Sequence, residues 1–81
     1  MTNIENLYQT SDWYLCVFLI AREHELIDVD RRDGKRCKFI FEDDFDLQSD
    51  VRGFWGNEDI GVQDFVAAVK KAKSILYSDS Y

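Results

Sequence analysis

A run of nine apolar residues, Trp13–Ala21, constrains the fold of this chain more than any other feature. The run is too short to cross a bilayer, which takes about 20 residues, and no basic segment precedes it as in a signal peptide. Thr10 or Ser11 can cap a helix at this point, and Asp12 suits the positive end of the helix dipole. The sequence therefore predicts a helix over about residues 11–22. Because its middle is apolar on every side, the helix must be buried all round or meet another molecule.

Two strand-like segments, 26–30 and 36–42, follow this helix, with Asp33-Gly34 between them as a turn. A three-residue loop over 32–34 is favoured, because it gathers apolar residues on one face and pairs opposite charges on the other. The apolar face then holds Ile27 opposite Phe39, Val29 opposite Cys37, and Phe41. The outer face pairs Asp28 with Lys38 and Asp30 with Arg36, and leaves Leu26 and Ile40 as an apolar pair that something covers.

The second half of the chain predicts two further helices. One begins at Asp46 and ends at Gly56 in a left-handed cap, with apolar residues at helical spacing: Leu47, Val51, Phe54 and Trp55. The other begins near Gly61 or Val62, and lysines lie towards its end, which suits the helix dipole. Its apolar stripe consists of Val62, Phe65, Val66, Val69, Ala72 and Leu76.

These segments predict one small α+β domain with the order helix, β-hairpin, helix, helix. A lone hairpin is marginal in water, so we expect the helices to pack on one face of a two-stranded antiparallel hairpin. Residues 1–9 are expected to form an N-terminal arm, in which a short helical turn is possible, residues 10–77 the domain and residues 78–81 a polar tail. With 81 residues, of which 46% are hydrophobic, the chain can bury a core but is too short for two ordinary domains.

Charge and cysteine use restrict the partners and the compartment. Sixteen acidic residues stand against ten basic ones, and the net charge of -6 argues against bulk attraction to nucleic acid or anionic lipid. The two cysteines, Cys16 and Cys37, lie in apolar segments and lack the spacing of a redox pair. We therefore expect buried thiols in a cytoplasmic protein that does not span a membrane.

Sequence motifs of enzymes are absent, so we expect neither enzymatic activity nor a cofactor. The only histidine, His24, lies between Glu23 and Glu25 and is interpreted as a solvated residue at the junction of helix and hairpin. An acidic stretch follows the second strand, and its residues Asp44, Asp46, Gln48 and Asp50 have the alternating spacing of a calcium loop. However, Ser49 replaces the turn glycine and Trp55 the bidentate glutamate. We therefore predict no metal site, and interpret the stretch as a solvated connection with Asp46 as N-cap.

Aromatic residues indicate a binding function, because the apolar side chains are hard to bury together in so short a chain. We expect a protein-binding module with an aromatic patch of Leu26, Ile40, Phe54 and Trp55, and an acidic rim of Asp43, Asp44, Asp46 and Asp50. The partner would be a protein with a basic surface, or a second copy in a homodimer. The alternative is a nucleic-acid-associated accessory factor that uses the basic hairpin tip: Arg31, Arg32, Lys35 and Arg36.

Several short stretches within residues 8–77 resemble a family of small uncharacterised domains from bacterial mobile elements and phages. They are Thr10-x-Asp12-x-Tyr14-Leu15, Asp33-Gly34, Phe39-x-Phe41-Glu42-Asp43, Phe54-Trp55 and Val62…Phe65…Lys73…Leu76-Tyr77. These are mostly core and cap residues, so the resemblance implies a shared fold, and it carries no catalytic residues over to this chain. It also implies a small accessory protein. One version is an inhibitor that blocks the nucleic-acid groove of a host protein, with the four rim aspartates mimicking phosphates.

Overall fold

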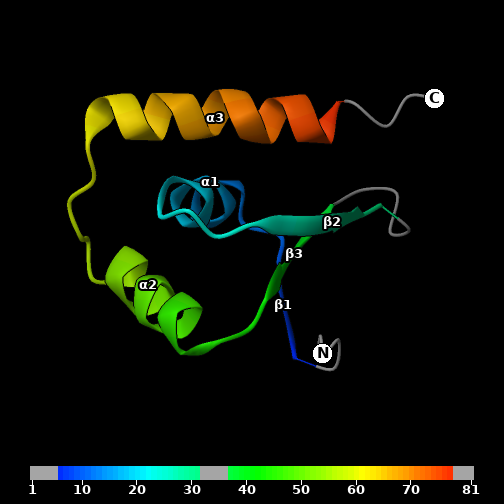
Figure 1. The fold of residues 1–81 in the computed structure, drawn as a ribbon, viewed down its shortest axis with the longest axis horizontal. Helices are drawn as coiled ribbons and strands as arrows, with labels where there is room; N and C mark the ends of the chain where they lie inside the picture. The colour runs from blue at the N-terminus through cyan, green and yellow to red at the C-terminus, as the bar shows by residue number, and fades with distance from the viewer. Residues whose placement is uncertain (1–5, 32–36, 78–81) are drawn as a thin grey trace.

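A three-stranded antiparallel sheet with helices on one side forms the fold in a computed structural model that describes residues 6–31 and 37–77 (Figure 1). The strand order is β1-β3-β2, so β3 is central. The helix α1 lies between the sheet and α3 (Figure 1). The elements of the described residues are β1 (Leu7–Thr10), α1 (Trp13–Ala21), β2 (Leu26–Asp30), β3 (Lys38–Glu42), α2 (Phe45–Trp55) and α3 (Val62–Leu76).

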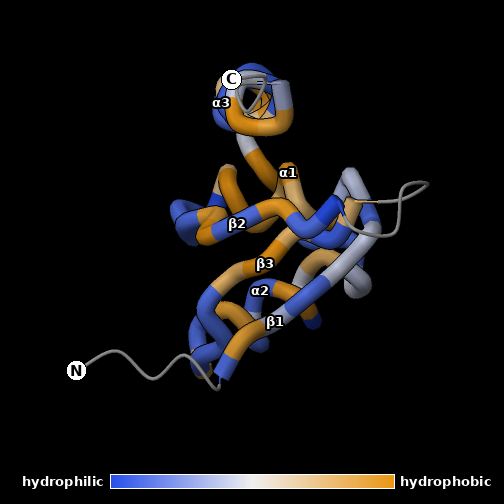
Figure 2. Tube along the Cα trace, turned by 90° about the vertical axis from the view of Figure 1, so that its right-hand side faces the viewer, coloured by the Kyte–Doolittle hydropathy of each residue, from blue (hydrophilic) through white to orange (hydrophobic). Residues whose placement is uncertain are grey.

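The central position of α1 follows from its sequence. Six consecutive residues, 15–20, are buried, and α1 packs against α3, α2 and β1. Its hydrophobic trace lies next to that of β3 in the interior (Figure 2). The N-cap is Asp12 rather than Thr10 or Ser11, because the Asp12 carboxylate accepts the amides of Tyr14 and Leu15 at 2.9 and 3.2 Å. The hydroxyl of Thr10 instead accepts the Asp12 amide at 3.1 Å.

The predicted two-stranded hairpin is wrong, because β1 adds a third strand to the sheet. Leu7 and Tyr8, which were compatible with a helical turn in an arm, pair with Glu42 and Phe41 of β3. The order of elements is therefore strand, helix, strand, strand, helix, helix. The four residues of β1 carry too weak a local signal to predict a strand, because their partners in β3 lie 29 to 35 residues further along the chain.

The register between β2 and β3 differs from the prediction by two residues. Val29 lies opposite Phe39 rather than Cys37, and a bulge between Leu26 and Asp28 sets Leu26 opposite Phe41. A two-residue shift keeps each face of the sheet, but the bulge exchanges the two residues at the start of β2. Leu26 therefore packs against the core, whereas Ile27 is 51% exposed. The predicted Leu26–Ile40 pair does not form, and the predicted turn and Arg36 lie outside the described residues.

The two later helices lie near their predicted positions but differ at their ends. The N-cap of α2 is Asp44, not Asp46, and Gly56 has an ordinary φ of -86°. The left-handed residue is Asn57, with a φ of 65°. The helix α3 begins at Val62 but turns that residue outward, because the small Ala68 and Ala72 form its buried side against α1.

Candidate functional site

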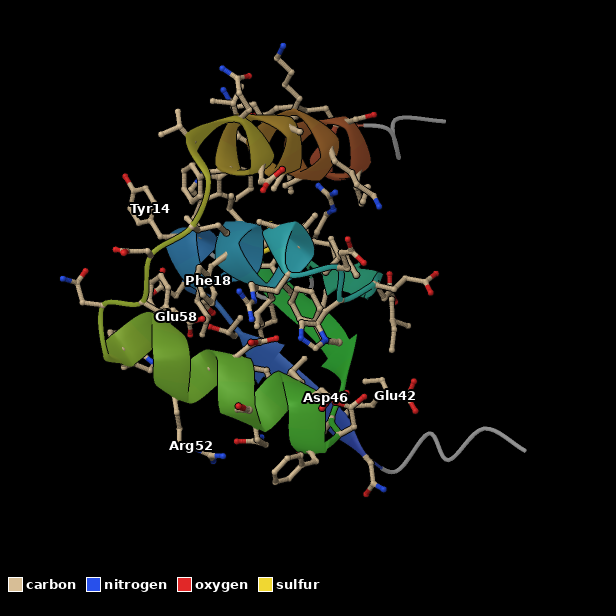
Figure 3. The ribbon with its side chains drawn as sticks, turned by 60° about the vertical axis from the view of Figure 1, so that its left-hand side comes forward. Tyr14, Phe18, Glu42, Asp46, Arg52 and Glu58 are labelled. Carbon is tan, nitrogen blue, oxygen red and sulfur yellow. The ribbon has the colours of Figure 1, made fainter. Side chains whose placement is uncertain are left out.

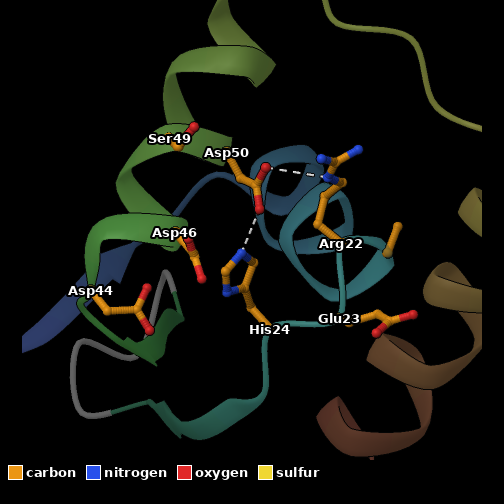
Figure 4. Close-up of a pocket in the computed structure, with 8 residues that line it drawn as sticks. Arg22, Glu23, His24, Asp44, Asp46, Ser49 and Asp50 are labelled. Carbon is orange, nitrogen blue, oxygen red and sulfur yellow. Dashed lines mark hydrogen bonds and ion pairs between the residues drawn. The ribbon is translucent and has the colours of Figure 1, made fainter.

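A polar hollow of about 630 Å³ opens where the C-terminal end of α1 meets the first half of α2 (Figure 4). Most of its lining is charged: Ala21, Arg22, Glu23, His24, Asp44, Asp46, Ser49 and Asp50. Three of the residues that the sequence assigned to an acidic rim therefore lie here, together with the only histidine.

Two basic side chains of the α1–β2 junction converge on one carboxylate of α2. The imidazole Nε2 of His24 lies 2.6 Å from Oδ2 of Asp50, and the Nε of Arg22 donates to Oδ1 at 3.2 Å (Figure 4). Because the carboxylate can only accept, Nε2 carries the hydrogen in this pair. The side chains of His24 and Asp50 are only 13% and 15% exposed. Partial burial strengthens such contacts relative to those on an open surface, so the group forms a clamp between α1 and α2.

An unusual backbone conformation places Arg22 and His24 on the same side of the turn. Glu23 has a φ of 72°, in the left-handed region that glycine usually occupies. Its amide donates to the carbonyl of Ile20 at 2.9 Å, and the amide of His24 to that of Leu19 at 3.0 Å. This pair of bonds is a Schellman motif, which ends α1 and reverses the chain. The reversal lets Arg22 and His24 approach Asp50 together.

The C-terminal end of α2 repeats the same motif and extends the clamp. Asn57 takes the left-handed position, and the Glu58 amide donates to the carbonyl of Gly53 at 2.9 Å. A Cβ on Gly53 would lie 2.0 Å from Oε1 of Glu58. The Glu58 side chain therefore packs directly on the backbone of Gly53, in space that a larger residue would occupy. From this position its Oε2 lies 3.4 Å from an outer nitrogen of Arg22. Arg22 thus joins two acidic residues.

The acidic segment before and within α2 is largely engaged by its own helix. Asp44 Oδ1 accepts the Leu47 amide at 2.7 Å, and Asp43 Oδ1 accepts the side-chain amide of Gln48 at 2.8 Å. The segment that resembled a calcium loop is therefore a helix start. Within residues 6–31 and 37–77, no group of three or more His, Cys, Asp or Glu side chains has an arrangement that could hold a metal ion.

The described geometry of the hollow is that of a structural clamp. The imidazole of His24 contacts Asp50, which is also held by Arg22, and the described contacts place no nucleophile against the ring. The sequence missed this group, since 26 residues separate His24 from Asp50 and no local pattern links them. The neighbours Glu23 and Glu25 instead indicated a solvated junction.

The residues of the predicted aromatic patch do not form one surface. Leu26 packs against the core, and Ile40 lies half-buried on the outer face of the sheet. Phe54 is half-buried, with its ring 5.5 Å from that of Phe18 and 5.0 Å from that of Trp55. Only Trp55 is strongly exposed, at 67%. It lies at the end of α2 away from the aspartates, about 16 Å along the helix from Asp44.

Other exposed apolar side chains accompany Trp55. The N-terminal ends of α1 and α3 and the C-terminal end of α2 lie at one edge of the molecule (Figure 3). Tyr14, Trp55 and Val62 belong to these ends and are 65%, 67% and 74% exposed. The connection between α2 and α3 adds acidic residues to the same edge. We call this edge the helix-end surface, and its residues are Tyr14, Trp55, Glu58, Asp59, Val62 and Asp64.

The remaining candidate residues are the two cysteines and the basic hairpin tip. Both thiols are free, and burial raises the pKa of the Cys16 thiol to about 12, which keeps it protonated and unreactive. Of the basic hairpin tip, only Arg31 is described, and its guanidinium donates to the carbonyl of Leu76 at the end of α3. Arg32, Lys35 and Arg36 lie outside the described residues.

The fold and these surfaces define a small α+β domain with a β-α-β-β-α-α order of elements. The chain belongs to the DUF5659 family, a domain of unknown function, whose model matches residues 5–78. This confirms the resemblance to a family of uncharacterised domains, whereas its association with mobile elements and phages stays a prediction. No curated protein and no solved structure matches the chain. Within the described residues, none of the helices has the length and apolar character needed to cross a membrane.

Proposed function

We propose that this domain is a non-enzymatic protein-binding module that contacts its partner through the helix-end surface. The exposure of Trp55 and Tyr14 carries this proposal. A domain of this size needs its large side chains for the core, so two aromatic rings left about two-thirds exposed at one edge require another explanation. Tyrosine and tryptophan are also the residues that most often dominate the binding energy of protein interfaces.

The charge of this surface favours a basic partner. Asp59 in the α2–α3 connection and Asp64 in the first turn of α3 are exposed, whereas the lysines of α3 lie in the second half of that helix. The whole chain has a net charge of -6. Such complementarity speeds the encounter with a basic protein and discriminates against acidic ones. In this proposal Asp59 and Asp64 take the place of the acidic rim expected from Asp43, Asp44, Asp46 and Asp50, of which Asp43, Asp44 and Asp50 already accept hydrogen bonds.

A cytoplasmic inhibitor is one form of this function. The resemblance to proteins of phages and mobile elements favours an accessory protein that blocks a basic groove of a host protein. In this form Asp59 and Asp64 would face the basic groove, while Trp55 and Tyr14 would supply the apolar contact.

Selection from a displayed library of random peptides tests the proposal while the partner is still unidentified. We expect the selected peptides to carry Arg or Lys next to an apolar residue. Trp55→Ala should weaken their binding by about tenfold or more, since a central aromatic contributes at least 1–2 kcal/mol. Phe45→Ala is the matched control, because Phe45 is 79% exposed at the opposite end of α2. Equal binding to the parent and to Trp55→Ala would exclude the helix-end surface.

A further inference from the structure

The sheet has two edges, β1 and β2, and they differ in how they are protected. Because β3 lies between them, each edge strand uses only one side of its backbone for pairing. The strand β1 pairs with β3 along one edge and contacts α1 on one face, and its other edge points away from both (Figure 2). An edge strand of this kind is a template for pairing with another chain unless something blocks it.

The ladder identifies the free backbone groups of β1. The Asp43 amide donates to the carbonyl of Asn6 at 2.9 Å, next to the first residue pair of the strand. In an antiparallel ladder, hydrogen-bonded pairs alternate with pairs that exchange no bonds. Tyr8 and Thr10 therefore bond to β3, whereas the N–H and C=O groups of Leu7 and Gln9 point outward.

The other edge, β2, is blocked in three ways. The same alternation makes Val29 its outward residue, and the side chain of Asp28 already accepts the Val29 amide at 2.8 Å. Two aspartates, Asp28 and Asp30, lie in this strand, and a bulge interrupts it between Leu26 and Asp28. Side-chain capping, charge and a bulge are recognised means of preventing the addition of a further strand.

The free edge of β1 has none of these features among the described residues. Its sequence, Leu7–Thr10, contains no charge and no proline, and the described hydrogen bonds place no side chain on the amides of Leu7 or Gln9. From this contrast we propose that the protein forms a two-fold dimer in which the β1 strands of two copies pair antiparallel. The two sheets then become one sheet of six strands.

A second copy fits this edge because the strand is complementary to itself. Outward residues must face outward residues, and the register centred on Tyr8 places Leu7 of each copy opposite Gln9 of the other. Only this register places both outward residues of each β1 strand in hydrogen-bonded pairs, and it leaves Asp12 beyond the paired residues. It also sets the two Tyr8 residues directly opposite each other in a pair without hydrogen bonds, where Cα atoms lie about 4.5 Å apart. Tyr8 packs against the core, so the two tyrosines extend the core across the dimer.

Repulsion between the negative charges of the two copies opposes this dimer, so its stability should depend on salt. Each copy has a net charge of -6. Besides burial, the negative charges of Asp43 and Asp12 raise the pKa of the Tyr8 phenol, so both carboxylates lie near the proposed two-fold axis. Salt screens such repulsion. Dimerisation should therefore strengthen with ionic strength, whereas binding of a basic partner at the helix-end surface should weaken.

Sedimentation velocity of the full chain tests the proposal at protein concentrations up to about 1 mM, where even weak association is visible. We expect a concentration-dependent dimer that is more populated in about 0.5 M NaCl than at low salt. Gln9→Pro deletes an outward N–H and leaves the bonds to β3 intact, and should raise the dimer Kd by about tenfold. Gln9→Glu should also raise the Kd, and by more than Gln63→Glu, which makes the same charge change on an exposed part of α3. A monomer under all these conditions, or an association that both Gln9 variants leave unchanged, would overturn the proposal.

Disulfide cross-linking tests the register. In a chain that also carries Cys37→Ser, Tyr8→Cys places two thiols across the two-fold axis at a separation that a disulfide can bridge. We expect it to form a linked dimer on mild oxidation faster than Thr10→Cys. Thr10 shares the face and the strand of Tyr8 but lies opposite Asn6 of the second copy. Equal cross-linking of the two variants would reject the register centred on Tyr8.

Discussion

His24 and Asp50 are joined by a 2.6 Å contact between Nε2 and Oδ2, across 26 residues of sequence. The contact links the turn after α1 to the middle of α2, and Arg22 reinforces it from the same turn. Two helices that meet at an angle are thereby held at a defined position by charge as well as by apolar packing.

Replacement of the shared carboxylate should destabilise the protein. Asp50→Ala removes the carboxylate that both His24 and Arg22 contact and leaves the partly buried His24 without this hydrogen-bond acceptor, so we expect the free energy of unfolding to fall by about 2 kcal/mol. Urea denaturation monitored by tryptophan fluorescence measures this loss. Asp46→Ala is the control on the same helix, because Asp46 is exposed and interacts mainly with the helix dipole, a contribution of about 0.5 kcal/mol. Equal losses in the two variants would show that the clamp contributes nothing specific.

Glycine at position 23 should stabilise the protein. Glu23 occupies the left-handed region, where a side chain costs about 1 kcal/mol relative to glycine. We therefore expect Glu23→Gly to raise the free energy of unfolding by about 0.5–1 kcal/mol. Glu25→Gly should have the opposite sign, since Glu25 does not have a positive φ and glycine only adds freedom to the unfolded chain there. Thermal unfolding of both variants checks the pair of signs.

Gly53→Ala distinguishes the contribution of helix propensity to stability from that of the Arg22–Glu58 ion pair. The new Cβ would displace the Glu58 side chain from Arg22, a loss of less than about 1 kcal/mol because the pair is roughly 40% exposed on both sides. Alanine within α2 gains about 0.5–1 kcal/mol over glycine. We expect little net change or a small gain in stability. In the Glu58→Ala background, where there is nothing to displace, the same substitution should give the full gain.

Alkaline pH should destabilise the fold through Cys16. Burial raises the pKa of this thiol from 9.0 to about 12, so the folded protein resists the deprotonation that the unfolded chain allows. The stabilisation from the protonated thiol is complete below pH 9 and is lost as the pH rises through 12, with a slope of up to about 1.4 kcal/mol per pH unit. Tyr8, whose pKa is also raised by burial and by Asp43, acts in the same direction at higher pH. Denaturation series between pH 8 and 11 should show a shallower slope for Cys16→Ala than for Cys37→Ala.

The sequence predicted the helices well because their signals are local. Each helix is indicated by residues that are close together in the sequence: the apolar run in α1, and the helical spacing of apolar residues in α2 and α3. The predicted helix ends therefore lie within about two residues of the observed ones. The predicted N-cap residues of α1 and α2 were wrong. Asp12 and Asp44 were both available, but the identity of the cap depends on which carboxylate reaches the free amides.

The strand pairing and the make-up of the sites depend on contacts between residues far apart in the sequence, which no local pattern predicts. Val29 prefers the apolar face in either register, so alternation could not choose between Cys37 and Phe39 as its partner. In the same way, Trp55 was predicted to belong to an exposed patch, but the aspartates predicted beside it lie at the start and in the middle of α2, away from Trp55 at its end.

The sequence by itself determined that this chain has one apolar central helix and an α+β fold, since those follow from the hydrophobicity and spacing of neighbouring residues. Only the tertiary structure decided that β1 completes the sheet, that a bulge turns Leu26 inward, and that His24 meets Asp50. Each of these is a pairing between distant segments. Its free energy depends on what the rest of the fold brings within reach, which neither partner encodes alone.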